Sequence, residues 1–428
     1  MKKKRSALAL LGGTPVTKER LPEVHNIGAR EIAAAVRVMK KGPLSGFLGT
    51  YSPRFLGGTE VLKFESMFAK TFKVKHAVSF NSATTALHAA IVALGIGPGD
   101  EVIVPPYTMS ASAMAVLMNG AVPIFADIDE KTFCIDPKSV EKRITKYTKA
   151  IMVVNLFGQA ADFSKLLPLA KKHKLKIIED NAQSPKATWK GRYTGTIGDI
   201  GIFSLNVHKV MQTGEGGVLV TNNPNCALRA QLCRNHGEAV VEKMKGYDAG
   251  PIFGSNYRMT EVTAAMAQVQ LARLDELTKR RVALAARLTK GLSGIAGLTP
   301  AYVAPGNTHV CYRYPIKIDE KKLGISRDRF VDAMRAEGFP IPKGYLTPLH
   351  LLPVFQQQKA FNNTHFPFKS EYYGGTPNYK KGICPVVERI EEKEFTLTDV
   401  CQYPHTAKQV DLFLQAVRKI VAHKDELR

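Results

Sequence analysis

The sequence predicts an α/β fold: a large domain built on a mainly parallel seven-stranded sheet, followed by a smaller C-terminal α+β domain. Strand-like and helix-like stretches alternate from residue 77 to residue 221, which is typical of a mainly parallel sheet. After Leu292 the composition becomes richer in Pro, Gly and Tyr, which indicates a second unit. We therefore divide the chain into residues 1–290, a large domain with an N-terminal arm, and residues 291–428.

The individual elements follow from hydrophobic periodicity, because short apolar runs favour buried strands and longer periodic stretches favour helices. The predicted strands of the large sheet are Ala77–Phe80, Glu101–Val104, Val122–Ala126, Ala150–Asn155, Lys176–Asp180, Ile200–Leu205 and Val218–Thr221. The predicted helices of the large domain are Glu31–Lys40, Glu60–Phe72, Ser164–His173 and the long stretch Glu261–Leu288. The small domain is predicted to contain a strand at Val310–Lys317 and helices at Arg327–Glu337 and Thr406–Ala422.

The chain is strongly basic, with 60 Lys and Arg residues against 37 Asp and Glu residues and a net charge of +23. Such a charge favours anionic partners, so a nucleic-acid or membrane role has to be considered. The basic residues are dispersed, however; the run Lys2–Arg5 is as long as any, and no zinc-finger or RNA-recognition signature accompanies them. We therefore expect no nucleic-acid partner.

The cysteines and the apolar segments indicate a cytoplasmic protein without a membrane partner. None of the six cysteines forms a Cys-x-x-Cys pair, so neither a metal site nor a disulfide framework is suggested. The apolar stretch Ala7–Leu11 is too short for a signal peptide, and no run approaches the roughly 20 apolar residues of a membrane helix.

Two charged residues follow predicted strands at the place where α/β proteins bind ligands. Asp180 ends one strand, and Lys209 lies just beyond another, in a segment that continues with Gly214, Gly216 and Gly217. Ligands of a parallel sheet bind in the crevice outside the carboxyl ends of its strands, so both side chains should face one crevice. A carboxylate that holds a protonated ring nitrogen and an amine that forms a Schiff base are the protein groups that pyridoxal phosphate (PLP) needs.

The segment Asn81–Leu87 supplies a candidate phosphate site, because it follows a predicted strand and opens a helical pattern. Its hydroxyls and the free backbone N–H groups of a helix N-terminus can hold an anion. Alone, this segment is equally well an ordinary helix cap. Together with Asp180 and Lys209 it completes the set of groups expected of a PLP site.

Four motifs make the chain resemble the DegT/StrS family of PLP-dependent sugar aminotransferases, which has the aspartate-aminotransferase fold (fold type I). They are Gly97–Pro105, Glu179–Gln183, Gly198–Gly217 and Gly254–Glu261, and they occur in the family's order. The resemblance implies that Lys209 and Asp180 are catalytic, as the Schiff-base lysine and the partner of the pyridine nitrogen. The other residues that it implies for cofactor binding are Gln183 against the ring or its hydroxyl, Ser82, Ala83, Thr84 and Ser204 at the phosphate, and Asn256 at the phosphate of a neighbouring subunit. It therefore also implies a homodimer with shared active sites.

The chain departs from the family pattern at three positions. Ala83 stands where the family often has Gly, and Asn155 stands where relatives often have His. Relatives commonly have an aromatic residue where this chain has Met109, so either Met109 or Tyr107 could pack on the cofactor ring. His350 is interpreted as structural.

The resemblance implies a transamination from glutamate or glutamine to a keto-sugar, usually nucleotide-linked, or to a keto-cyclitol. One alternative is a PLP-dependent sugar dehydratase of the same fold, in which His replaces the lysine. His208 directly precedes Lys209, but Lys209 lies five residues after Ser204 and Gly214 lies ten after it, which matches the aminotransferase spacing. The other alternative is a non-catalytic regulator that binds PLP or nucleic acid.

Overall fold

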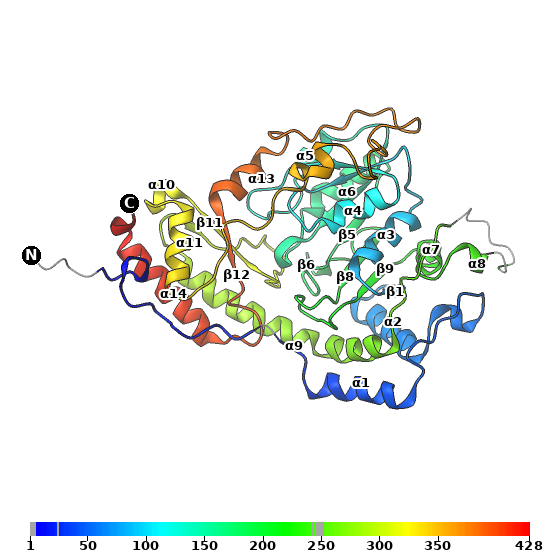
Figure 1. The fold of residues 1–428 in the computed structure, drawn as a ribbon, viewed down its shortest axis with the longest axis horizontal. Coiled ribbons are helices and arrows are strands. Elements are labelled where there is room, and N and C mark those ends of the chain that lie inside the picture. The colour runs from blue at the N-terminus through cyan, green and yellow to red at the C-terminus, as the bar shows by residue number, and fades with distance from the viewer. Residues whose placement is uncertain (1–5, 24, 242–243, 245–251) are drawn as a thin grey trace, which may run out of the picture.

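The computed structural model describes residues 6–23, 25–241, 244 and 252–428. The run Lys2–Arg5 lies outside the described residues. Figure 1 shows a large lobe around the main sheet and a smaller lobe that carries β11, β12 and α14. The long helix α9 (Glu261–Leu292) runs from one lobe to the other.

The large sheet has the seven predicted strands, and each end lies within two residues of its prediction. Their order is β1-β9-β8-β5-β4-β2-β3. The pairs from β8 to β3 are parallel, whereas β9 runs antiparallel to both of its neighbours. The strands are β1 (His76–Phe80), β2 (Glu101–Val104), β3 (Val122–Phe125), β4 (Thr148–Val154), β5 (Lys176–Asp180), β8 (Ile200–Ser204) and β9 (Gly217–Thr221). The prediction of a mainly parallel sheet is confirmed.

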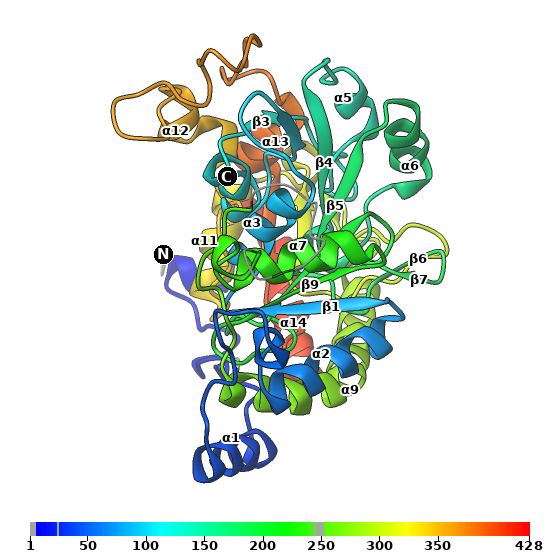
Figure 2. The ribbon, with the colours of Figure 1, turned by 90° about the vertical axis from the view of Figure 1, so that its right-hand side faces the viewer.

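Helices cover both faces of this sheet, because alternate side chains of a strand point to opposite faces. Ile202 of β8 lies in the core beneath α3 (Ala83–Ala93) and α7 (Pro224–Arg234), while its neighbour Phe203 packs against α2 (Thr59–Phe72). Figure 2 shows α3 and α7 above the sheet and α2, α9 and α1 (Ala29–Lys41) below it. Further helices around the sheet are α4 (Ala111–Met118), α5 (Pro137–Glu141), α6 (Phe163–Lys172) and α8 (Glu238–Val241).

The smaller lobe contains the antiparallel sheet β10-β11-β12 and its own core. Its strands are β10 (Leu298–Thr299), β11 (Tyr314–Ile318) and β12 (Phe395–Thr398), and its helices include α10 (Glu320–Leu323), α11 (Arg327–Ala336) and α14 (Ala407–Ala422). The predicted strand Val310–Lys317 begins too early. Val310 N–H donates to Gly158 O over 2.7 Å and Cys311 has a φ of 50°, so residues 310–313 follow the loop after β4 and not the small sheet.

Two segments cross the predicted domain boundary at residue 290. Leu8 of the N-terminal arm packs into the small-lobe core, whereas Leu349, Phe355 and Val387 pack into the core of the large sheet. This second segment contains α12 (Pro353–Gln356) and α13 (Pro385–Arg389). The division at residue 290 stays a prediction. None of the helices that the structure describes is long and apolar enough to cross a membrane.

Candidate active site

Lys209 lies in the loop that joins the antiparallel strands β8 and β9. The loop is closed by backbone hydrogen bonds from Leu205 N to Gly216 O and from Val207 N to Gly214 O. The Lys209 side chain is half-buried, and its Nζ lies 4.7 Å from the centroid of the Tyr312 ring. The lysine is thus a loop residue at the carboxyl end of β8, as predicted.

Asp180, at the end of β5, is a buried carboxylate that is 6% exposed. Its Oδ2 accepts a hydrogen bond from Ser112 Oγ at 2.7 Å, and its Oδ1 accepts one from Ala182 N at 3.2 Å. Burial raises the pKa of Asp180, while these two hydrogen bonds and the positive charge of Lys209 act in the opposite direction. The positive charge of Lys209 therefore acts on the carboxylate of Asp180. The side chain of His208 is exposed.

Gln183 has a fixed side-chain orientation, because both ends of its amide are hydrogen-bonded. Its Oε1 accepts from Phe157 N at 2.8 Å, and its Nε2 donates to Tyr345 Oη at 3.1 Å. Phe157 adopts a left-handed conformation with φ of 58°, which is rare for a bulky residue and is often found at functional sites. Tyr345 lies in the loop before α12. A residue from the C-terminal part of the chain, beyond residue 290, thus helps to orient Gln183.

The N-terminus of α3 lies directly against the start of β9. Ser82 is the N-cap residue, and its Oγ accepts from Thr85 N at 3.1 Å. A Cβ on Gly217 would lie 2.4 Å from Ser82 O and 2.5 Å from Ala83 N, so only glycine permits this approach. Ser204 pairs with Gly217 in the sheet, which brings Ser82, Ala83 and Ser204 together at a helix N-terminus that can hold a phosphate.

Thr84 is exposed in the first turn of α3, and Asn256 is exposed on a neighbouring segment. Asn81 N–H donates to the carbonyl of Tyr257 at 2.9 Å, which ties that segment to the start of α3. The Oδ1 of Asn256 accepts from Arg258 N at 3.4 Å, and the side chain faces the surface.

The two candidates for packing on the cofactor ring occupy different environments. Tyr107 is fully buried, and its hydroxyl donates to Glu391 Oε2 at 2.6 Å within a cluster of aromatic rings. Met109, just before α4, is 58% exposed. Tyr107 is thus engaged in the core, and Met109 is the one of the two whose side chain is free at the surface.

Asn155 and His350 have structural partners. Asn155 is buried and donates to Glu179 Oε2 and Asn181 Oδ1, at 3.1 and 3.0 Å. His350 is buried against Glu388, with 2.9 Å between Nε2 and Oε1. Neither needs a ligand to explain its place.

Sequence reasoning did not identify four residues that lie at the site in the structure: Ser112, Tyr312, Tyr345 and Glu391. Ser112 lies 68 positions before its partner Asp180, and the other three come from the small-domain half of the chain. The high tyrosine content of that half is the one signal that could have drawn attention to two of them. Spacing along the chain carries no information about contacts over such separations.

The residues present fit PLP. A buried carboxylate at Asp180, an amine at Lys209 and a helix N-terminus at Ser82 and Ala83 are the groups that its ring nitrogen, aldehyde and phosphate require, and they lie beside the neighbouring strands β5, β8 and β9. When bound, PLP supplies an electron sink, and the chain supplies the groups that orient it and move protons.

The sequence profile of the DegT/DnrJ/EryC1/StrS aminotransferase family matches residues 50–378. The chain is 39% identical to GDP-perosamine synthase of Caulobacter vibrioides over 302 residues, which are 70% of this chain and 79% of that one. It is 33% identical to L-glutamine:2-deoxy-scyllo-inosose aminotransferase of Streptoalloteichus tenebrarius over 439 residues, with 98% and 99% of the two chains covered. It also resembles the crystal structure of DesV from S. venezuelae in complex with a ketimine intermediate, with a TM-score of 0.77, 32% identity and coverage of 92% and 94%. The chain is therefore a PLP-dependent aminotransferase and belongs to the DegT/DnrJ/EryC1/StrS aminotransferase family.

Proposed function

We propose that this enzyme transfers the amino group of glutamine to a keto-cyclitol, with Lys209 and Asp180 as the catalytic pair. The observation that supports the proposal is the placement of Lys209 and Asp180 at the carboxyl ends of the neighbouring strands β8 and β5, with Gln183 just after β5. We favour glutamine over glutamate as the donor because of one relative that aligns with nearly the whole of this chain. That relative is named for L-glutamine and 2-deoxy-scyllo-inosose. A nucleotide-linked keto-sugar is the second candidate acceptor, favoured by the 39% identity to GDP-perosamine synthase.

Each residue of the site has a proposed task. Lys209 holds the cofactor and then, once the donor amine has taken its place, carries a proton between carbon atoms through its Nζ. Asp180 keeps the ring nitrogen protonated, and Gln183 contacts the ring or its hydroxyl. The phosphate is held by Ser82, Ala83, Thr84 and Ser204.

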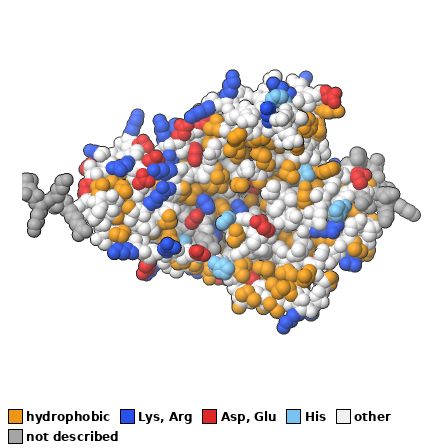
Figure 3. Space-filling model, viewed as in Figure 1, with side chains coloured by type: hydrophobic (Ala, Val, Ile, Leu, Met, Phe, Trp, Pro, Cys, Tyr) orange, Lys and Arg blue, Asp and Glu red, His pale blue; other side chains and the backbone are white. Residues whose placement is uncertain are grey.

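A second copy of the chain completes the site in this proposal. Asn256 is exposed, as a residue that reaches the partner's phosphate must be. On α1, the apolar side chains Ile32, Val36 and Met39 are 58%, 37% and 56% exposed, and their spacing places them on one face. Figure 3 shows hydrophobic side chains gathered over this helix, at the lower right. Such a patch on an otherwise charged surface favours a protein partner, here the second subunit.

The proposal is tested with glutamine and two acceptors, a keto-inositol and a nucleotide-linked keto-sugar, with the aminated product identified by mass spectrometry. We expect amination of the keto-inositol that depends on Lys209 and survives His208→Ala. Amination of the nucleotide-linked keto-sugar alone would replace the cyclitol with the second candidate. Loss of activity in His208→Ala with an unaffected Lys209→Ala would contradict the assignment of the lysine.

A further inference from the structure

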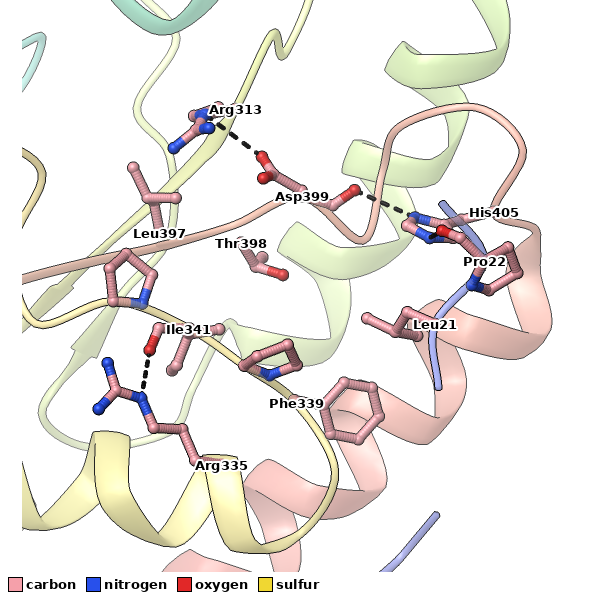
Figure 4. A pocket seen from close by; sticks show the side chains of 12 residues that line it. Leu21, Pro22, Arg313, Arg335, Phe339, Ile341, Leu397, Thr398, Asp399 and His405 are labelled. Carbon is pink, nitrogen blue, oxygen red and sulfur yellow. Dashed lines mark hydrogen bonds and ion pairs between the residues drawn. The ribbon is translucent and has the colours of Figure 1, made fainter. Parts of the chain in front are cut away.

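The N-terminal arm connects the small lobe with the loop that carries Lys209. Leu21 and Pro22 of the arm line a cavity of about 460 Å³ in the small lobe (Figure 4). There the carbonyl oxygen of Pro22 lies 3.0 Å from Nε2 of His405, which holds the arm against the small lobe. Four residues further along the chain is Asn26, whose side chain contacts the lysine loop.

Asn26 makes a buried hydrogen bond to this loop. Its side chain is 6% exposed, and its Nδ2 donates to the carbonyl oxygen of Val210 at 3.0 Å. A carbonyl oxygen only accepts, so the nitrogen of the amide must face Val210, and the orientation of the Asn26 side chain is fixed. Val210 directly follows Lys209 in the chain. The bond therefore holds the carbonyl group of the residue next to the lysine.

Gln270 of α9 ties the arm and the lysine loop together. Its Oε1 accepts from Gln212 N in the loop at 3.1 Å, and its Nε2 donates to Asn26 O in the arm at 3.3 Å. The same Nε2 donates to Glu31 Oε1 at 2.7 Å, and this oxygen also accepts from Arg273 Nη1 at 2.6 Å. Gln270 and Glu31 are fully buried. Asn26 is thus held in place by α9 and the arm before its amide meets the loop.

Packing and hydrogen bonds restrict the lysine loop in different ways. Val210 and Met211 are 1% and 0% exposed and belong to the same core as Tyr312. Apolar contacts are non-directional, so they keep this segment in the core without fixing the rotation of its peptide groups. Hydrogen bonds are directional. The bond from Asn26 therefore sets how the backbone is turned where the side chain of Lys209 leaves it.

We propose that Asn26 is a positioning residue that orients the side chain of Lys209 toward the cofactor site. The inference rests on the proposed function, in which Lys209 holds the cofactor. Without the N–H donor of Asn26, the buried carbonyl of Val210 has to turn toward water or another donor, and Lys209 turns with it. A misplacement of about 1 Å can slow a reaction between fixed groups on the order of 100-fold.

The experiment measures how fast Lys209 captures PLP, with neither amino donor nor acceptor present. Apoprotein is mixed with PLP, which condenses with the lysine amine and releases water. Borohydride added at set times reduces the resulting imine to a stable amine, and peptide mass spectrometry measures the pyridoxyl group on Lys209. The variants are Asn26→Ala and Asn26→Asp, which keeps the shape of the side chain but loses the N–H donor.

Asn119→Ala is the matched control. Asn119 Nδ2 also donates to a backbone carbonyl, that of Ile96, but this bond joins two segments outside the lysine loop. Urea unfolding compares the stability of all variants. We expect both Asn26 variants to capture PLP on the order of 10–100-fold more slowly than the wild type, and Asn119→Ala to capture it at the wild-type rate.

The absorbance band of the loaded protein gives a second readout. The pH midpoint of this band depends on the geometry at Lys209 and not on global stability, so we expect it to shift in both Asn26 variants and to stay unchanged in Asn119→Ala. If Asn26→Ala does not fold, Asn26→Asp alone decides.

Two outcomes would overturn the role of Asn26: a wild-type capture rate in its folded variants, or an equal loss in Asn119→Ala, which would mean general destabilisation. The proposed function fails in a different way. If the wild-type protein carries the pyridoxyl group on another lysine, the assignment of Lys209 is wrong, and the role of Asn26 falls with it.

Discussion

At the scale of single residues, buried side chains fix the positions of the site residues through hydrogen bonds within the chain. Glu391 accepts hydrogen bonds from Tyr107 Oη at 2.6 Å and from Tyr345 N at 2.8 Å. Tyr345 then holds Gln183, so one carboxylate of the small-domain half connects two loops of the active site. Glu391 lies in a short π-helical turn, a feature that often occurs at functional sites.

This network predicts the effect of removing one hydroxyl. Tyr345→Phe leaves Gln183 Nε2 without its partner, which costs about 1–3 kcal/mol for a buried group. If this whole cost appears in cofactor affinity, PLP binds about 5–160-fold more weakly, as measured by titrating the apoprotein and following its fluorescence. Tyr379→Phe removes a buried hydroxyl that donates to Pro123 O, so it controls for destabilisation without a site effect. Equal PLP affinity in both variants would show that Tyr345 does not orient Gln183.

A buried histidine predicts how stability depends on pH. Burial lowers the pKa of His309 from its ordinary 6.5 to about 3, and its Nδ1 accepts from Cys311 N at 2.9 Å. Below about pH 6.5 the unfolded chain binds a proton that the folded state does not. The free energy of unfolding therefore falls as the pH decreases from 6.5 toward 3, by up to about 1.4 kcal/mol per pH unit.

Urea unfolding at several pH values measures this contribution. In His309→Asn, the free energy of unfolding should fall less steeply with decreasing pH, because one proton fewer is taken up on unfolding. His173→Asn, at an exposed helix end, is the control. An unchanged slope in His309→Asn would mean that this histidine is not neutral in the folded protein.

At the scale of elements, the close contact between β9 and α3 gives a prediction for Gly217→Ala. The added methyl group would lie 2.4 Å from Ser82 O, so the helix N-terminus must move. We expect a loss of about 1–3 kcal/mol in stability, as overpacking typically causes, and weaker binding of PLP, both read from thermal unfolding with and without cofactor. Gly97→Ala, whose Cβ would meet its nearest atom at 3.7 Å, is the control. Tight PLP binding by Gly217→Ala would contradict the placement of the phosphate site.

The elements also show which parts of the fold sequence patterns can predict. The seven large strands were predictable because each is a short apolar run bounded by polar or turn residues. The start of β11 was not, because residues 310–313 are held by hydrogen bonds to Phe157 and Gly158, more than 150 positions away. The places of Lys209 after β8 and of Asp180 at the end of β5 were predictable from the sequence, while their roles in the site stay a prediction. Their supports, Ser112, Tyr312 and Tyr345, were not, because they depend on tertiary contacts.

At the scale of the whole molecule, the long helix α9 ties the lobes together through arginines. Arg281 is the example among the basic residues of α9. This side chain is 2% exposed, and its Nη1 lies 3.4 Å from Cys311 O and 3.2 Å from Tyr312 O. Part of the high positive charge thus serves to hold Tyr312 over Lys209, which neither composition nor net charge could reveal.

The proposed homodimer gives a prediction at this scale. Replacing Ile32 and Met39 by Glu places two charges in the apolar face of α1, so we expect monomers in light scattering after size exclusion. PLP should then bind more weakly, because Asn256 of the partner no longer reaches the phosphate. Val282→Glu, at a 39% exposed position of α9, is the control. A dimer that persists in the double variant would place the interface elsewhere.

The absorbance spectrum of the purified protein shows whether Lys209 and PLP form the reacting centre. We expect a band near the visible edge that shifts when glutamine is added and that is absent from Lys209→Ala, while His208→Ala behaves as the wild type. A wild-type protein without such a band after addition of PLP, or a Lys209→Ala variant that keeps the band and its response to glutamine, would contradict this account.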